Sequence, residues 1–204
     1  MISIQIDTGP IVRALEGSTK QIPFAIASAL TATAKAGQAE IVDTLGEDMT
    51  IRNGWTAKGI RIEPARKDKL EAAVGSRDRF MALQALGGER EGKDGHAQAI
   101  PVGIRPTPQA LTPRSKWPGK MLQKRAVFMA KTHSGRLGIW RRTGKAGYPI
   151  ALLYWIQRGA VHVKARWHLA ERFGATAAKV WPGLATAAIE RAVADEARKA
   201  GAKA

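Results

Sequence analysis

Residues 22–45 read IPFAIASALTATAKAGQAEIVDTL, and this stretch decides the class of fold that the chain can adopt. Apolar side chains recur along it at helical spacing, with alanines and one glycine, Gly37, between them. Pro23 suits the first turn of a helix, and Gly46 suits the position just after the last turn. The pattern predicts one long helix over 22–45, whose small residues allow another element to pack closely against it.

Shorter segments on either side of this helix carry other patterns. Alternating apolar residues predict a short strand at 2–7, a hairpin at 59–76 and a second hairpin at 125–142. A continuous apolar run predicts a further strand at 148–156. A helix is predicted over 182–200, where a proline stands near the start and a glycine at the end.

Two loop-like stretches separate the hairpins. Residues 77–95 are rich in glycine and charge, which predicts a loop with one helical turn at 80–86. Residues 96–122 contain five prolines, which predicts an extended arm or irregular loop and not a helix. We therefore expect a single α+β domain over 1–204, an antiparallel sheet of hairpins packed by a long N-terminal helix and a C-terminal helix, with Pro/Gly-rich residues 77–122 inserted as an extended loop or arm.

The bulk composition limits the class of protein. With 204 residues, 45% hydrophobic and 25% charged, the chain has ordinary globular composition. It contains no cysteine, which excludes disulfides, thiolate metal sites and cysteine nucleophiles. The first residues lack the basic and apolar regions of a signal peptide, and no window approaches the roughly 20 apolar residues of a membrane span. We expect no membrane partner.

Charge is the strongest physical signal in the sequence. The net charge is +16, yet residues 1–50 carry three cations against six acids. Between Asp94 and Glu171 there is no acid, and fourteen lysines and arginines lie in that interval. Such a block of one sign implies attraction to nucleic acid, to an anionic surface or to an acidic protein.

The sequence shows no pattern typical of a catalytic or metal site. His162 and His168 flank Lys164 and Arg166, whose charges disfavour a metal, and no carboxylate lies nearby. Residues 87–93 are glycine-rich but lack the order of a phosphate-binding loop, and no nucleophile motif occurs. We assign no catalytic residue, no cofactor and no metal ligand, and we predict that the protein is not an enzyme.

Aromatic side chains interleave with the cations of the acid-free block. They are Trp117, Phe128, Trp140, Tyr154, Trp155 and Trp167. One interpretation is nucleic-acid binding through phosphate contacts with some stacking. The other is a solvated basic face over a core that uses tryptophan for bulk. We favour contact with DNA or an acidic protein, and we expect any DNA contact to be non-specific because no sequence-reading motif occurs.

Several segments, in order along the chain, resemble one family. Residues 22–34, IPFAIASALTATA, are similar to an alanine-rich opening helix. Residues 125–130, RAVFMA, look like a strand leading into a hairpin, and residues 144–150, GKAGYPI, resemble a basic turn that begins a strand. Together they resemble the phage minor tail protein Z family, the tail-completion proteins of long-tailed bacteriophages, and more loosely the head–tail joining and tail terminator proteins.

This resemblance implies a structural virion protein of the phage neck. It would complete or terminate the head-proximal end of the tail and join it to the head. The family implies a homo-oligomeric ring, a hexamer, around the DNA channel, with tail tube and head-connector proteins as neighbours and non-specific contact with packaged DNA. The implied location is the virion tail or neck, with the host cytoplasm during assembly.

A ring around DNA needs a basic inner surface and aromatic or arginine anchors between subunits. The cations that we expect to face DNA or an acidic partner are Arg114, Lys116, Lys120, Lys124, Arg125, Arg141 and Arg142. Trp117 and Trp140 are the candidates for the subunit interface. Two alternatives stay open: a non-specific nucleic-acid-binding or packaging protein, which would bind DNA alone with strong salt dependence, and an enzyme such as a nuclease or peptidoglycan hydrolase.

Overall fold

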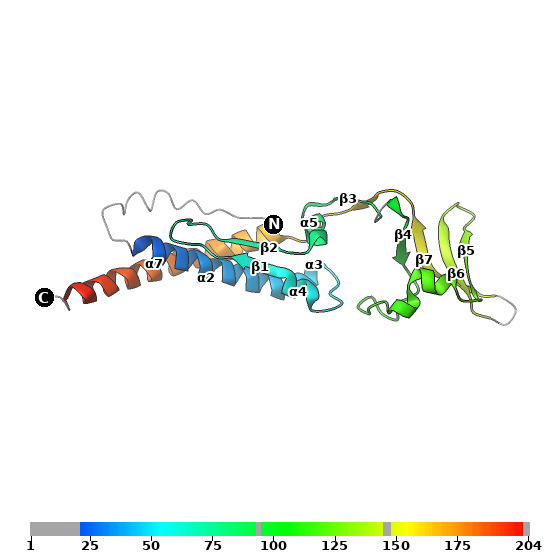
Figure 1. The fold of residues 1–204 in the computed structure, drawn as a ribbon, viewed down its shortest axis with the longest axis horizontal. Coiled ribbons are helices and arrows are strands. Elements are labelled where there is room, and N and C mark those ends of the chain that lie inside the picture. The colour runs from blue at the N-terminus through cyan, green and yellow to red at the C-terminus, as the bar shows by residue number, and fades with distance from the viewer. Residues whose placement is uncertain (1–20, 93–94, 145–147, 202–204) are drawn as a thin grey trace. The chain divides into compact units, whose positions relative to one another are not determined.

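The computed structural model describes residues 21–92, 95–144 and 148–201, and it is an α+β protein with antiparallel strands (Figure 1). The predicted fold class is confirmed. The strand predicted at 2–7 lies outside the described residues. Contacts group the chain into two compact units: a helical unit from 1–49, 53–86 and 165–204, and a strand unit from 50–52 and 87–164. We predicted a single domain with an arm inserted at 77–122. The division into two compact units does not test that prediction.

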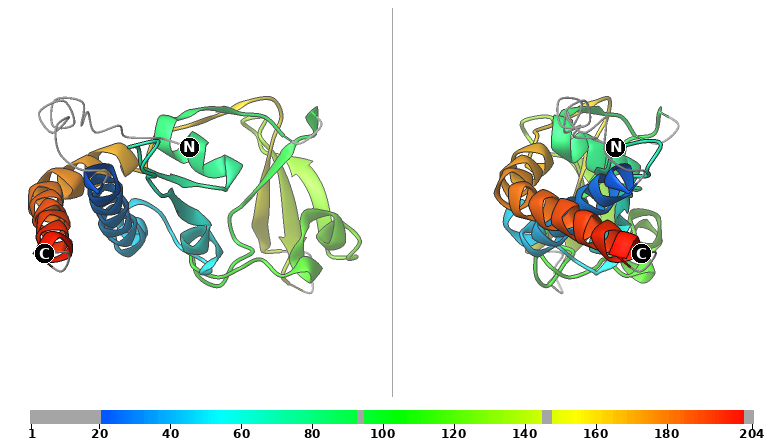
Figure 2. Two further views of the ribbon diagram at one scale, coloured as in Figure 1. Left: turned by 60° about the vertical axis from the view of Figure 1, so that its left-hand side comes forward. Right: turned by 90° about the vertical axis from the view of Figure 1, so that its left-hand side faces the viewer.

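Two long helices form the centre of the helical unit. Helices α2 (Ile22–Asp43) and α7 (Leu169–Gly201) lie side by side and run in opposite directions (Figures 1 and 2). At their contact the Phe173 ring fills the space where a side chain of Gly37 would stand, because an added Cβ would lie 2.5 Å from that ring. The close packing predicted from the small residues of α2 is confirmed.

The ends of both helices differ from the predictions. Helix α2 ends at Asp43, and a one-turn helix, α3 (Leu45–Asp48), follows, so Gly46 lies inside α3 and is not a helix stop. Helix α7 begins at Leu169, with Pro182 inside it. An internal proline costs about 3 kcal/mol. Burial of Leu169 and Phe173 contributes roughly 1.5–3 kcal/mol each, which offsets that cost.

A hairpin packs against α2 in the helical unit. Its strands are β1 (Ile60–Glu63) and β2 (Ala73–Ser76), preceded by α4 (Trp55–Gly59) and followed by α5 (Arg79–Leu86). Ile60 and Val74 are buried, and the Gln38 side chain of α2 donates a hydrogen bond to the Ile60 carbonyl at 2.8 Å. The predicted hairpin at 59–76 and the predicted helical turn at 80–86 are both confirmed.

The strand unit contains a four-stranded antiparallel sheet. Its order is β4 (Gln98–Pro101), β7 (Ile150–Gln157), β6 (Leu137–Arg142), β5 (Val127–Lys131). A separate pair joins β3 (Gly88–Arg90) to β8 (Val161–Val163). The hairpin predicted at 125–142 and the strand predicted at 148–156 are confirmed, whereas β3 lies within a stretch that we predicted as loop.

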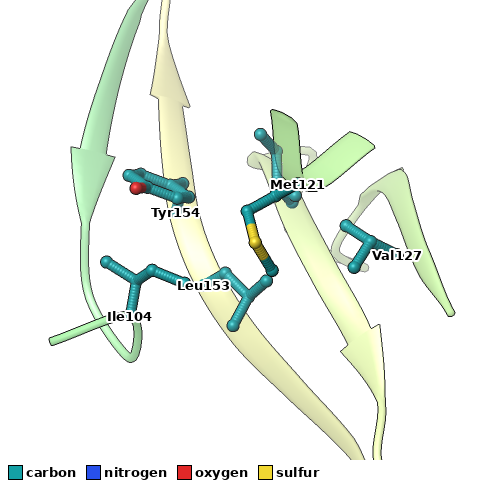
Figure 3. Packing of buried hydrophobic residues seen from close by; sticks show 6 residues of the cluster. Ile104, Met121, Val127, Leu153 and Tyr154 are labelled. Carbon is teal, nitrogen blue, oxygen red and sulfur yellow. The ribbon is translucent and has the colours of Figure 1, made fainter. Parts of the chain in front are cut away.

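The proline-rich stretch at 96–122 is more ordered than predicted. Besides β4 it forms a 3-10 turn, η2 (Arg114–Lys116), and a one-turn helix, α6 (Pro118–Leu122). The prediction of no helix here is wrong because Pro118 occupies the first turn of α6, where a proline removes no hydrogen bond. Met121 of α6 is only 2% exposed and packs into the core of the strand unit (Figure 3).

That core lies on one face of the four-stranded sheet. Its members are Ile104, Met121, Val127, Ile139, Leu153 and Tyr154 (Figure 3). Helix α6 thus covers this face. Among the helices of the described residues, none has both the length and the apolar character that crossing a bilayer requires.

Candidate nucleic-acid or acidic-partner interface

Most of the net charge belongs to the strand unit. Residues 50–52 and 87–164 contain sixteen lysines and arginines against three acids, a net +13 of the chain's +16. The ion pairs between described side chains lie in the helical unit, at Lys69–Glu71 and around Asp48. Within the part of the chain that the structure describes, no cation of the strand unit forms an ion pair with a carboxylate.

Five of the seven predicted contact cations come from one segment. This segment, here called the α6 segment, comprises η2, α6 and the turn that follows. Its predicted contact cations are Arg114, Lys116, Lys120, Lys124 and Arg125. Buried Met121 holds α6 against the core, and the Tyr154 hydroxyl donates to the Lys116 carbonyl at 2.7 Å. Burial raises the pKa of Tyr154, and the nearby charge of Arg105 opposes this only in part. The segment is fixed to the core; Arg114, Lys120, Lys124 and Arg125 are exposed, and Lys116 is half-buried.

The other two predicted cations lie at the end of β6 and point to opposite faces of the sheet. Arg141 is opposite Val127 of the core. Arg142 instead places its guanidinium carbon 4.7 Å from the centre of the Phe128 ring. Because neighbouring residues of a strand alternate between faces, the structure does not bring the seven cations onto one face.

The two tryptophans predicted at a subunit interface differ in exposure. Trp117 is 51% exposed, with its indole nitrogen donating to the Thr112 carbonyl at 3.3 Å and Arg114 lying 5.9 Å from its ring. Trp140 is half-buried on the sheet, and its indole nitrogen donates to the Ala130 carbonyl at 3.2 Å. Their role as subunit anchors stays a prediction.

The predictions missed Arg136, which stacks on Trp155. Its guanidinium carbon lies 4.3 Å from the centre of that ring, and Trp155 in turn meets Trp140 edge-on at 5.9 Å. Period-two spacing could have found this residue. Arg136 stands just before β6 and is separated by even numbers from Trp140 and Arg142, which share one face of that strand.

The predictions also missed a pair of arginines that lie close enough to repel each other. The Nε atom of Arg52 donates to the Pro108 carbonyl at 3.0 Å, and that of Arg105 donates to the Thr112 hydroxyl at 2.9 Å. Burial lowers the pKa of Arg52, and the charge of Arg105 lowers it further.

In the helical unit, a histidine–carboxylate cluster has a structural explanation. Asp48 accepts hydrogen bonds from the His168 backbone and ring, at 3.2 and 3.0 Å, and from Arg172 at 3.0 Å. These donors stand just before and within the first turn of α7, where a negative charge is favourable. Among the described residues, no three histidine or carboxylate side chains come together in a way that could hold a metal ion.

Substituting Asp48 by asparagine should show how much this cluster stabilises the fold. Burial raises the pKa of Asp48, but hydrogen bonds from His168 and Arg172 outweigh it and lower that pKa below the ordinary 3.8. A lowered carboxyl pKa stabilises the folded state at neutral pH, and this stabilisation is lost as pH falls below 3.8 towards the folded-state value. We expect Asp48→Asn to cost about 1 kcal/mol at pH 7, because solvent screens the exposed partners.

Urea unfolding at several pH values measures this effect. The difference between wild type and Asp48→Asn should shrink in acid. The control is Asp43→Asn, at the end of α2, whose carboxylate has no ion pair with a described residue. A pH-independent difference for Asp48→Asn would contradict this account.

The fold and the surface together define an α+β protein with a strongly basic strand unit, whose cations form no ion pair with another described side chain. No protein-family model, curated protein or solved structure matches the chain. Its function must therefore be argued from the residues and the geometry described above.

Proposed function

We propose that this chain is a non-enzymatic structural protein of a phage neck. It completes or terminates the head-proximal end of the tail and joins it to the head, as a homo-oligomeric ring around the DNA channel. One observation carries the proposal: the strand unit has a net charge of +13, and its cations have no ion pair with another described side chain. The resemblance of residues 22–34, 125–130 and 144–150 to tail-completion proteins supplies the location.

The physical argument concerns self-repulsion. Several copies of a +13 unit placed side by side repel one another unless DNA or acidic neighbours neutralise them. A ring around packaged DNA meets this condition. Exposed Trp117, beside Arg114, is the type of residue that anchors subunit interfaces. The tail tube and head-connector proteins are the proposed neighbours, in the virion and in the host cytoplasm during assembly.

Immunogold electron microscopy of purified particles tests the location. With antibodies raised against the purified chain, gold should lie at the junction of head and tail. Heads and tails from a phage that lacks the gene serve as the staining control and should carry no gold. Gold at the distal tip of the tail or inside the capsid would contradict the proposal.

Removing cations from the α6 segment should impair assembly. We expect Lys120→Gln, Lys124→Gln and Arg125→Gln together to lower the yield of DNA-filled infectious particles about tenfold, because three exposed phosphate or carboxylate contacts are lost. The matched control, Lys58→Gln, Arg61→Gln and Lys67→Gln, removes the same charge from exposed positions of the helical unit. Equal yields from both triple variants would count against a role of this segment.

A second candidate function is a free nucleic-acid-binding or packaging protein. The stacking of Arg136 and Arg142 on aromatic rings favours it, because aromatic rings and guanidinium planes are the groups on which proteins stack unpaired bases. The two functions differ in the isolated chain: the neck protein should bind duplex DNA weakly and form rings with its partners. Tight duplex binding with a steep salt dependence would favour the packaging protein.

A further inference from the structure

One face of the four-stranded sheet carries a row of aromatic rings that ends in an arginine on each side. We call it the aromatic strip: Phe128, Trp140 and Trp155, flanked by Arg142 and Arg136. Phe128 and Trp140 are direct partners across β5 and β6, and Trp140 meets Trp155 edge-on. The row thus crosses three neighbouring strands.

The strip lies on the face opposite the core. Ile139 and Tyr154 are register partners and belong to the buried core that α6 covers. Trp140 and Trp155, the next residue on each strand, therefore project from the other face. Both rings are only partly buried, and Ile100, the partner of Trp155 on β4, is 41% exposed.

Gly138 fixes how the central indole lies. A Cβ at Gly138 would stand 3.0 Å from Nε1 of Trp140, so a larger residue there would push the ring off the sheet. With glycine, the indole lies across the strand and donates its hydrogen bond to the Ala130 carbonyl. The ring is thus held in place before any ligand arrives, which lowers the entropic cost of binding.

The arginines at the two ends are also held in place. Arg142 lies over Phe128 at 4.7 Å and Arg136 lies over Trp155 at 4.3 Å. A guanidinium stacked on a ring keeps its N–H groups at the edge, where they can donate to an anion. No acid occurs between Asp94 and Glu171, so this interval supplies no competing carboxylate.

A pocket opens at the Arg136 end of the strip. Its volume is about 520 Å³, within the range of small-ligand sites. Arg136, Trp155 and Ile100 line it from the face of the strip, whereas Met129, Lys131 and Leu137 line it from the core face, so the pocket lies around the end of the sheet. Arg158 adds a third cation, and none of the described lining residues is acidic. Three cations beside an indole suit a ligand that combines a planar ring with a phosphate.

We infer that the aromatic strip and this pocket bind single-stranded nucleic acid. Arg136 and Arg142 contact phosphates, bases pack on the exposed parts of the rings, and one nucleotide enters the pocket. A duplex keeps its bases stacked inside and could satisfy only the arginines. An acidic peptide would likewise leave the indole-lined pocket without a planar ligand. The inference rests on this geometry alone and does not depend on a place in a virion.

Fluorescence anisotropy with the purified full chain tests it. The probes are labelled oligo(dT) of about 16 nucleotides, a length that suits one small binding surface, and a labelled duplex of the same length. We expect the single strand to bind at least about tenfold more tightly than the duplex. Unlabelled poly-glutamate of equal charge serves as the acidic-peptide competitor and should displace the oligonucleotide poorly.

Two charge-matched variants separate the strip from general electrostatic attraction. Arg136→Gln with Arg142→Gln should weaken oligo(dT) binding about tenfold or more. Arg61→Gln with Lys67→Gln removes the same charge from exposed positions of the helical unit and should weaken it about threefold or less. Trp155→Leu keeps apolar bulk and should also weaken binding about tenfold, with circular dichroism confirming that each variant is folded.

The outcomes are distinct. Equal losses from the two charge pairs, or duplex binding as tight as single-strand binding, would overturn the inference. Efficient displacement by poly-glutamate would point to an acidic protein as the occupant and would overturn it too. None of these binding results changes the position of the immunogold label on phage particles. The proposal of a neck protein is therefore tested independently of this inference.

Discussion

Gly37→Ala is expected to lower the free energy of unfolding by about 1–3 kcal/mol, although alanine is the better helix former. Alanine gains about 1 kcal/mol of helix propensity over glycine. At this position, however, the added Cβ would lie 2.5 Å from Phe173, and neither α2 nor α7 can separate without exposing buried apolar residues. Overpacking should therefore outweigh propensity.

Gly174→Ala on α7 is the matched control. Gly174 follows Phe173, and a Cβ there would meet nothing within 4 Å, so only the propensity gain of up to about 1 kcal/mol remains. Thermal and urea unfolding measure both variants. In a Phe173→Ala background, which itself costs about 3–5 kcal/mol, the Gly37→Ala penalty should vanish. A stabilised Gly37→Ala variant would show that the helices do not pack in this way.

Ile139→Ala is expected to cost the strand unit about 2–5 kcal/mol. Ile139 is 0% exposed within the core, among Met121, Val127, Leu153 and Tyr154, so its truncation removes buried apolar contacts and leaves a cavity. Hydrogen exchange followed by mass spectrometry locates the effect. Amides of β5, β6 and β7 should exchange faster in the variant.

Met129→Ala is the control for this substitution. Met129 is the cross-strand partner of Ile139 on the same face of the sheet, but it is 47% exposed, so its truncation leaves little cavity. We expect a loss below about 1 kcal/mol. If exchange in α2 and α7 accelerates as much as in β5–β7, the helical and strand units unfold together and not as separate units.

Local patterns in the sequence were sufficient to predict most regular elements. Helical spacing placed the long helix over residues 22–45, and α2 with α3 occupies them. Period-two alternation placed both hairpins, because a half-buried strand must alternate apolar and polar residues. Local patterns failed at Pro118, which lies in the first turn of α6, and at Pro182, which lies inside α7. A proline predicts the end or start of a helix unless its position within the turn and the burial around it are known.

The candidate site was predicted only in part. The acid-free interval identified the basic block. Lys120, Lys124 and Arg125 of the α6 segment are exposed, as residues of a contact surface must be. The separation of Arg142 from Arg141 and the stacking of Arg136 on Trp155 depend on the pairing of strands. Pairing joins residues that are distant in the chain, so charge counting along the sequence could not find it.

The amino-acid sequence alone determined the α+β class, the two hairpins and the concentration of positive charge, because each of these follows from residues close together in the chain. The start of α7 at Leu169, the burial of Met121 and the aromatic strip were decided by tertiary packing. Each requires a partner surface, α2 or the four-stranded sheet, assembled from distant segments. Free energy gained by burial on that surface overrides the local preference of a proline or a loop.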